Sequence, residues 1–299
     1  MNAGTSTDSA GRAGLKRRQW RAPAAAALLL AAWLLAFARH GGGAAIERGP
    51  SFPPPASLLE AGSLGFLRQL FAEMLFVESA VHYGAEADPW RIPPRHLDAY
   101  AALFRVMARL HPRLLDVYYR VEGVLTWQGE RYAREANAVL RIGRRALPDE
   151  IVIPFFIGFN DFRFLHQPLK AADAFEEAAR MPEAPGWFGH LAAILRGRGG
   201  DIRGGLLLLQ ARLRTTSDAG ERERLQRDIR VYKDALRVQL ALERFHAHTG
   251  RYPTALSELA PAWLARIPDM GGKYELVYQP PRLSLRPKEP RHRAPRQRR

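Results

Sequence analysis

The residues best suited to chemistry in this chain occur singly or in weak pairs. His246 and His248 stand two positions apart on an expected helix, where side chains at i and i+2 point to different faces, so they make a poor pair of metal ligands. Glu73 and Glu78 lie in an apolar helix, and their spacing assigns neither of them a facing acid or base. The Gly-rich segment 197–200 follows no expected strand, so it fits a turn between helices better than a phosphate-binding loop. We therefore expect no catalytic residue, no metal and no cofactor.

Other chemistries lack their sequence signals. There is no Gly-x-Ser-x-Gly elbow and no His-Glu-x-x-His helix. The chain has no cysteine, which excludes disulfides, thiolate metal sites, a cysteine nucleophile and a cysteine-linked lipid anchor. An enzyme stays an alternative hypothesis, and it would require a deep polar pocket in which acids or histidines converge.

The formal charge of +15 over 299 residues comes mainly from the two ends of the chain. Residues 1–21 carry about +4 and residues 283–299 about +6, which leaves about +5 for the long middle. A mildly basic globular domain has a similar charge, and no nucleic-acid-binding motif accompanies it. We expect no nucleic-acid partner.

An uncharged apolar run covers residues 22–38 and follows the basic cytoplasmic segment 1–21. At about 1.5 Å per residue, such a helix is just long enough to cross a bilayer. The positive-inside rule places the N-terminus in the cytoplasm and the rest outside, as a single-pass protein of a bacterial inner membrane with a periplasmic soluble domain. The alternative is a cleaved signal peptide ending at Ala36-Phe37-Ala38. The Gly- and Pro-rich segment 39–60 then reads as a linker.

Residues 61–248 show apolar side chains at helical spacing, with proline or glycine at short and regular intervals. Proline is well tolerated in the first turn of a helix because the N–H that it lacks has no intrahelical partner there. The pattern predicts four helix pairs and a longer closing helix: 64–83 with 95–111, 113–128 with 131–146, 150–165 with 168–181, 185–198 with 201–214, and then 218–248.

The spacing of small and large residues in these pairs resembles the tetratricopeptide repeat family. The clearest copy has Gly158, Ala171, Phe175 and Ala178, with its closing proline one residue early at Pro182. Neighbouring copies match over residues 113–216, at Ala136, Leu140, Gly143 and Pro148, and at Phe188, Ala192, Leu195, Gly204, Leu208 and Ala211. Small residues of this kind let helix axes approach closely, while the large ones fill the space between layers.

The resemblance implies a concave groove, built from the first helix of each pair, that holds a peptide or protein. An aromatic strip flanked by arginines would suit an extended ligand with apolar anchors and an acidic group. Phe155 and Phe156 could equally be core residues. The positions that the family pattern turns into the groove are Val117, Arg120, Val124, Trp127 and Gln128, then Val152, Phe155, Phe156, Phe159, Phe162 and Arg163, and finally His190, Ala193 and Arg196.

One position departs from the family pattern. Asp161 stands where a large aromatic side chain is usual. A carboxylate between helices must find a partner or turn to solvent, because burying an unpaired charge is costly. Asp161 is therefore either a structurally paired acid or a functional one.

Residues 249–286 resemble the globular end of the major pseudopilins of type II secretion. The matching motifs are Gly250-Arg-Tyr-Pro253, Ile267-Pro-Asp269 and Gly271-Gly-Lys-Tyr274, in that order. Met270 stands where a proline is usual, and the N-terminal methylation motif of pseudopilins is missing. Alternating segments 274–278 and 283–286 predict a hairpin, and we expect this module to cover the open end of the helical array. Residues 287–299 read as a disordered basic tail.

Together these features predict a mainly α fold, a tetratricopeptide-like α-solenoid with one transmembrane helix and a small C-terminal β-hairpin module. The expected function is a membrane-anchored, extracytoplasmic scaffold or adaptor that binds an unidentified protein or peptide of the envelope or secretion machinery. An accessory component of a secretion or pilus-type system is the alternative.

Overall fold

The computed structural model describes residues 31, 67–86, 88–182 and 184–288. In this part of the chain most residues are helical, and two short strands follow the last long helix. The elements are α4 (Arg68–Gly84), α5 (Pro94–Leu110), α6 (Leu115–Val124), the 3-10 helix η2 (Thr126–Gln128), α7 (Glu130–Ala146), α8 (Val152–Arg163), α9 (Pro168–Ala179), α10 (Trp187–Arg198), α11 (Ile202–Thr215), α12 (Ala219–Thr249), η3 (Leu256–Leu259), β1 (Tyr274–Gln279) and β2 (Arg282–Pro287).

Local signals in the sequence explain several helix ends. Pro94 and Pro168 occupy the first positions of α5 and α9, where their missing N–H leaves no hydrogen bond unmade. The Asp201 carboxylate accepts a hydrogen bond from the Gly204 N–H at 2.8 Å and so caps α11. Helix α12 ends at Thr249 and is followed by Gly250, which has the left-handed φ of 72° that glycine adopts without strain. The predicted helices are confirmed to within a few residues.

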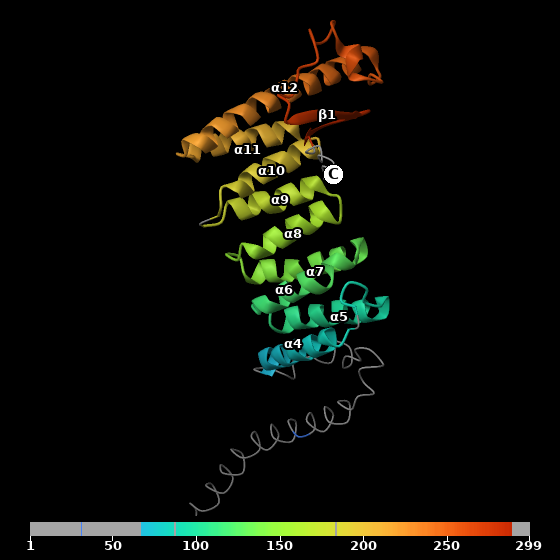
Figure 1. Cartoon of the computed structure of the whole chain (residues 1–299), viewed down its shortest axis with the longest axis vertical. Helices are drawn as coiled ribbons and strands as arrows, with labels where there is room; N and C mark the ends of the chain where they lie inside the picture. Colours follow the sequence, from blue (N-terminus) through green and yellow to red (C-terminus); the bar gives the residue numbers. More distant parts are fainter. Residues whose placement is uncertain (1–30, 32–66, 87, 183, 289–299) are drawn as a thin grey trace, which may run out of the picture.

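The helices stack one after another along the long axis of the molecule (Figure 1). The principal contacts join each helix to helices close to it in sequence, such as α8 to α9, α9 to α10, α10 to α11 and α11 to α12. One prediction needs adjustment. The helix expected over 113–128 is interrupted, because α6 ends at Val124 and a separate turn of 3-10 helix continues to Gln128.

Three clusters of buried side chains form the core along the stack. The first joins α4 to α8, the second lies mainly between α9 and α10, and the third joins α10, α11 and α12 to the C-terminal segment. Close helix approach depends on small residues. A Cβ at Gly143 would lie 2.4 Å from the ring of Tyr118, and one at Gly158 would lie 3.0 Å from the ring of Phe175. Gly143 therefore lies where α7 meets α6, and Gly158 lies where α8 meets α9.

Strands β1 and β2 form an antiparallel hairpin in which Tyr274 pairs with Pro287 and Gln279 with Arg282. This confirms the predicted hairpin. Its buried side chains, including Leu283 and Leu285, join the last hydrophobic cluster. The hairpin contacts α10 and α12, whereas α12 is the element that packs along α11 (Figure 1). Helix α12 therefore covers the last helix pair, and the hairpin lies beside it.

Several predicted segments lie outside the described residues: the basic segment 1–21, the apolar run 22–38 except residue 31, the linker 39–60, and the tail 287–299 beyond Lys288. Within the ranges that are described, every helix is too short or too polar to span a bilayer. The proposed anchor is therefore untested by the structure.

Candidate functional site

A continuous line of ring contacts joins five aromatic side chains from four segments of the chain. We call these five residues, Trp90, Trp127, Phe159, Phe155 and Trp187, the aromatic ribbon. Ring centroids lie 6.5 Å apart for Trp90 and Trp127, and 6.2 Å apart for Trp127 and Phe159. Phe155 continues the line, with centroid distances of 6.3 Å to Phe159 and to Trp187. The ribbon joins the loop before α5, η2, α8 and the start of α10.

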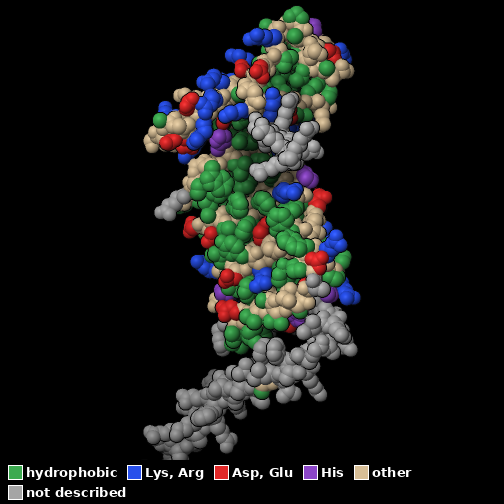
Figure 2. Space-filling model, in the orientation of Figure 1, with side chains coloured by type: hydrophobic (Ala, Val, Ile, Leu, Met, Phe, Trp, Pro, Cys, Tyr) green, Lys and Arg blue, Asp and Glu red, His purple; other side chains and the backbone are tan. Residues whose placement is uncertain are grey.

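The three tryptophans of the ribbon are well exposed. Trp90 is 73% exposed, Trp127 is 48% and Trp187 is 50%. Hydrophobic side chains gather over the middle helices on the face drawn in Figure 2. Soluble proteins rarely leave large aromatic side chains exposed in a contiguous group, and such groups mark interaction surfaces. Tryptophan in particular contributes much of the energy at binding hot spots.

The ribbon is held in place by packing beneath it and by one backbone tie. Phe164 lies edge-on to Trp127 at a centroid distance of 5.2 Å. The Gln128 side-chain amide donates to the Pro89 carbonyl oxygen at 2.9 Å, which joins η2 to the loop that carries Trp90. The predicted groove residue Gln128 therefore positions the ribbon, and two segments 37 residues apart present their indoles together.

Two of the predicted arginines, Arg120 and Arg163, contact aromatic rings. The Arg120 guanidinium stacks at 5.2 Å from the ring centroid of Phe76, and at 5.9 Å from that of Tyr83, on α4. Arg163 is exposed at the end of α8, 5.7 Å from the ring centroid of Phe164. Arg163 is free to meet an acidic group of a ligand, whereas Arg120 is already held by aromatic rings.

Some predicted groove residues do not lie on the surface. Val117 and Val124 are 0% and 1% exposed and belong to the first hydrophobic cluster, so they contact neighbouring helices. Val152, Phe155 and Phe156 are half-buried and pack against the core with one side. Sequence reasoning left Phe155 and Phe156 open between groove and core; both pack against the core and keep part of the side chain exposed.

The predicted groove positions on α10 face other helices. Ala193 is fully buried, and its carbonyl oxygen accepts a hydrogen bond from the Tyr232 hydroxyl of α12 at 2.8 Å. His190 Nε2 lies 3.1 Å from a carboxylate oxygen of Asp228, which is also on α12. Because α12 packs over this side of α10, the groove expected there is filled.

Arg196 is likewise engaged within the fold. Its guanidinium lies 2.7 Å from an Asp173 oxygen and 2.8 Å from a Glu176 oxygen, both on α9, and 3.3 Å from an Asp201 oxygen. This clamp ties α9 to the end of α10, and these hydrogen bonds and charges raise the pKa of Arg196 above its ordinary value. Phe162, the last of the predicted groove residues, is half-buried. The Arg198 guanidinium lies over its ring, 5.0 Å from the ring centroid.

Asp161 is a buried and partnered acid. It is 2% exposed, and its carboxylate accepts a hydrogen bond from the Asn137 side-chain amide at 2.9 Å. The Asn160 amide donates to Asn137 at 3.1 Å and also to Glu122 at 2.9 Å. Thr126 donates to the same Glu122 oxygen at 3.0 Å. Two carboxyl groups are therefore joined by asparagines across α6, α7 and α8.

This polar network lies inside the stack, away from bulk solvent. Burial raises the pKa of the Glu122 and Asp161 carboxyls above their ordinary values, despite the hydrogen bonds that they accept. A pair of raised pKa values can mark an active site. Here each carboxyl is enclosed by helices, and the hydrogen bonds to it join α6, α7 and α8. The sequence reasoning flagged Asp161 but missed Glu122, Asn137 and Asn160.

The two histidines of the sequence analysis point to different aromatic partners. His246 stacks on Tyr252 with ring centroids 4.1 Å apart, and His248 lies 5.3 Å from Trp263. Over the described ranges, no group of three or more His, Asp or Glu side chains is placed to hold a metal ion.

Comparison with known proteins leaves the family of this chain open. No protein-family model, curated protein or solved structure matches it.

Proposed function

We propose that this protein is a scaffold or adaptor that binds an extended segment of a protein partner along the aromatic ribbon. The observation that carries the proposal is the exposure of Trp90, Trp127 and Trp187 in one unbroken line of ring contacts. An extended peptide could place apolar side chains between these rings. Exposed Arg163 at the edge would pair with an acidic side chain or a C-terminal carboxylate of that segment.

The proposed framework for this surface is a tetratricopeptide-like α-solenoid. Three features support it: antiparallel helices paired in sequence order, contacts chiefly between neighbours, and small residues at helix crossings such as Gly143 and Gly158. In such an array the first helix of each pair lines one face. Trp127, Phe159 and Trp187 belong to those helices or directly follow them.

The proposed location follows from the chain ahead of this framework. The apolar run 22–38, with its basic N-terminal flank, would insert as a single anchor and leave the helical domain in the periplasm of a bacterial cell. The scaffold would then present its ribbon to proteins of the envelope or of a secretion system.

The test compares partner recovery by in-cell crosslinking of the full-length chain. Trp127→Ala combined with Trp187→Ala removes two exposed anchors and should reduce the crosslinked partner by about tenfold or more, since each hot-spot tryptophan is worth about 2 kcal/mol or more. Leu207→Ala removes a 60% exposed apolar side chain from α11 and is the matched control.

Two outcomes would count against the assignment. Equal partner recovery with the double variant and the control would refute the ribbon as the binding surface. A crosslinked species that contains only a second copy of this chain would replace the partner with self-association. Circular dichroism of both purified variants should match the parent, because exposed side chains contribute little to the core.

A further inference from the structure

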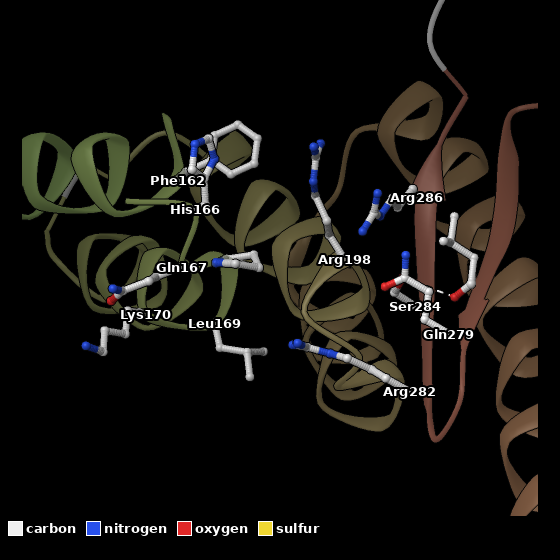
Figure 3. A pocket seen from close by; sticks show the side chains of 12 residues that line it. Phe162, His166, Gln167, Leu169, Lys170, Arg198, Gln279, Arg282, Ser284 and Arg286 are labelled. Atoms are coloured by element: carbon white, nitrogen blue, oxygen red, sulfur yellow. Dashed lines mark hydrogen bonds between the residues drawn. The ribbon is translucent and has the colours of Figure 1, made fainter. Parts of the chain in front are cut away.

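A cavity of about 540 Å³ lies where the turn between α8 and α9 and the end of α10 face the C-terminal hairpin (Figure 3). Its lining includes apolar side chains such as Phe162, Leu169 and Val277. All charged side chains among its lining residues are cationic, and none is aspartate or glutamate. The cationic ones are Lys170, Arg198, Arg282 and Arg286, and His166 lies beside them.

The three arginines come from two segments far apart in the chain, α10 and β2. In Figure 3, Arg282 and Arg286 extend from β2 toward the helices, and Arg198 rises from α10 between the hairpin and Phe162. Arg282 donates to the Gly199 carbonyl oxygen at 2.6 Å, which fixes the hairpin against the end of α10. Arg282 also borders a second pocket that contains Asp201 and Glu243, so Arg198 and Arg286 are the two arginines that line this cavity alone.

Arg286 is the least satisfied of the three. Its Nε atom is buried and has no hydrogen-bond partner among the described residues. A buried guanidinium N–H without an acceptor is unfavourable, because it has lost its water without gaining a partner. The Arg198 guanidinium stacks on Phe162, which leaves its N–H edges open to an acceptor.

The start of α9 adds uncharged donors to the same cavity. Gln167, Pro168, Leu169 and Lys170 line it, and these are the N-cap and the first turn of the helix. No side chain caps this helix. The N–H groups of Leu169 and Lys170 and the positive end of the helix dipole therefore lie at the border of the space that the arginines line.

From this convergence we propose that the cavity binds a phosphate-bearing ligand, either a phosphomonoester or a diphosphate group. A single carboxylate would leave most of the cationic side chains uncompensated, whereas a phosphate group carries up to two charges and a diphosphate more. Arginine forks match phosphate oxygens in pairs. The apolar part of the lining would contact the organic portion of the ligand. This site is separate from the aromatic ribbon and does not depend on the proposed function.

Isothermal titration calorimetry on the purified full chain in detergent tests the proposal, with inorganic phosphate and pyrophosphate as probes at constant ionic strength. We expect saturable binding, with pyrophosphate binding about tenfold more tightly than phosphate. Arg198→Gln and Arg286→Gln, tested separately, should each weaken pyrophosphate by about tenfold or more. Arg230→Gln removes one exposed charge from α12 and should change affinity less than about twofold.

The source of the phosphate is distinguished in a second arm. Glycerol phosphate and dihexanoyl phosphatidate carry the same headgroup, and tighter binding of the phosphatidate would identify a lipid ligand, whereas equal binding would identify a free phosphate compound. Absence of saturable binding by phosphate and pyrophosphate up to about 10 mM would overturn the site. If Arg230→Gln weakened pyrophosphate binding as much as the cavity variants do, the binding would reflect only the overall positive charge of the protein, and the proposed site would be overturned as well.

Discussion

Replacement of Glu122 by glutamine should stabilise the protein at neutral pH. The Glu122 carboxyl is 8% exposed, and one of its oxygens accepts hydrogen bonds from Thr126 and Asn160. The side-chain oxygen of Asn160 is buried and has no hydrogen-bond partner in the described part of the chain. A glutamine can keep both accepted hydrogen bonds and adds an N–H donor beside Asn160, without burying a negative charge.

The sign of the pH dependence follows from the direction of the pKa shift. Burial raises the pKa of the Glu122 carboxyl above its ordinary value of 4.5. The folded state therefore holds its proton to higher pH than the unfolded state does, and the stability of the parent falls as pH rises above about 4.5. Below that pH both states are protonated, so the substitution should change little there.

The expected gain at pH 7 is about 1–3 kcal/mol, the usual cost of an imperfectly satisfied buried polar or charged group. In a domain of this size it corresponds to a rise in Tm of about 2–4 °C per kcal/mol. The assay is thermal unfolding of the full-length parent and of Glu122→Gln between pH 4 and pH 7.5. The difference should widen with pH.

An opposite-sign control is available. Hydrogen bonds from the Arg212 guanidinium and the Thr216 hydroxyl lower the pKa of Glu221 below its ordinary value of 4.5. The ionised Glu221 carboxylate therefore stabilises the folded state at pH 7, and this stabilisation is lost as pH falls below about 4.5. Glu221→Gln should therefore destabilise most at pH 7. A Glu122→Gln variant that is destabilised at pH 7 but not at pH 4 would refute the reasoning, since it would show that the fold satisfies the ionised carboxylate.

Three further predictions test the packing, the hairpin and the C-terminal turn. Gly143→Ala places a Cβ against the ring of Tyr118 and should lower the free energy of unfolding by about 1–3 kcal/mol. Gly123 has open space around it, so Gly123→Ala should raise the free energy of unfolding by up to about 1 kcal/mol. Denaturant titration of both variants measures the difference. Gly200 has a φ of 91°, and a Cβ there would lie 3.1 Å from a carbonyl oxygen of β2, so Gly200→Ala should speed amide exchange in the hairpin; unchanged exchange would contradict the close approach. Hydrogen bonds from Thr254 and Arg251 lower the pKa of Glu258 to about 2, so the turn should open as pH falls from about 4.5 toward 2 in the parent, and NMR should find no such pH dependence in Glu258→Gln.

The helices and the hairpin could be predicted because their signals are local. Pro94 and Pro168 mark helix starts, and the alternation of Tyr274 to Tyr278 marks a strand. The family pattern also selected Trp127 and Phe159, which the structure brings into ring contact. These predictions needed only the spacing within one or two neighbouring elements.

The errors arose where packing between distant segments decides exposure. The pattern assigns Ala193 to a groove, but it cannot know that Tyr232, on a helix 39 residues later, covers it. Polar residues such as Asn137 look solvent-facing in a single helix, and only the stacked helices show that they meet other polar groups inside. Arg198 and Arg286 come together because the hairpin folds back onto α10.

The stacked arrangement has a mechanical consequence for a protein that would be held by its N-terminus. Three apolar side chains of α4 are exposed: Leu70 at 50%, Val77 at 62% and Val81 at 65%. The principal contacts of α4 are with α5. A pulling force that enters at Arg68 would load the contacts of α4 with α5 and with Arg120 first, and would then detach the helices in sequence order. The hairpin is held to the end of α10 by the hydrogen bond from Arg282, so it would stay in place until the last helices unfold.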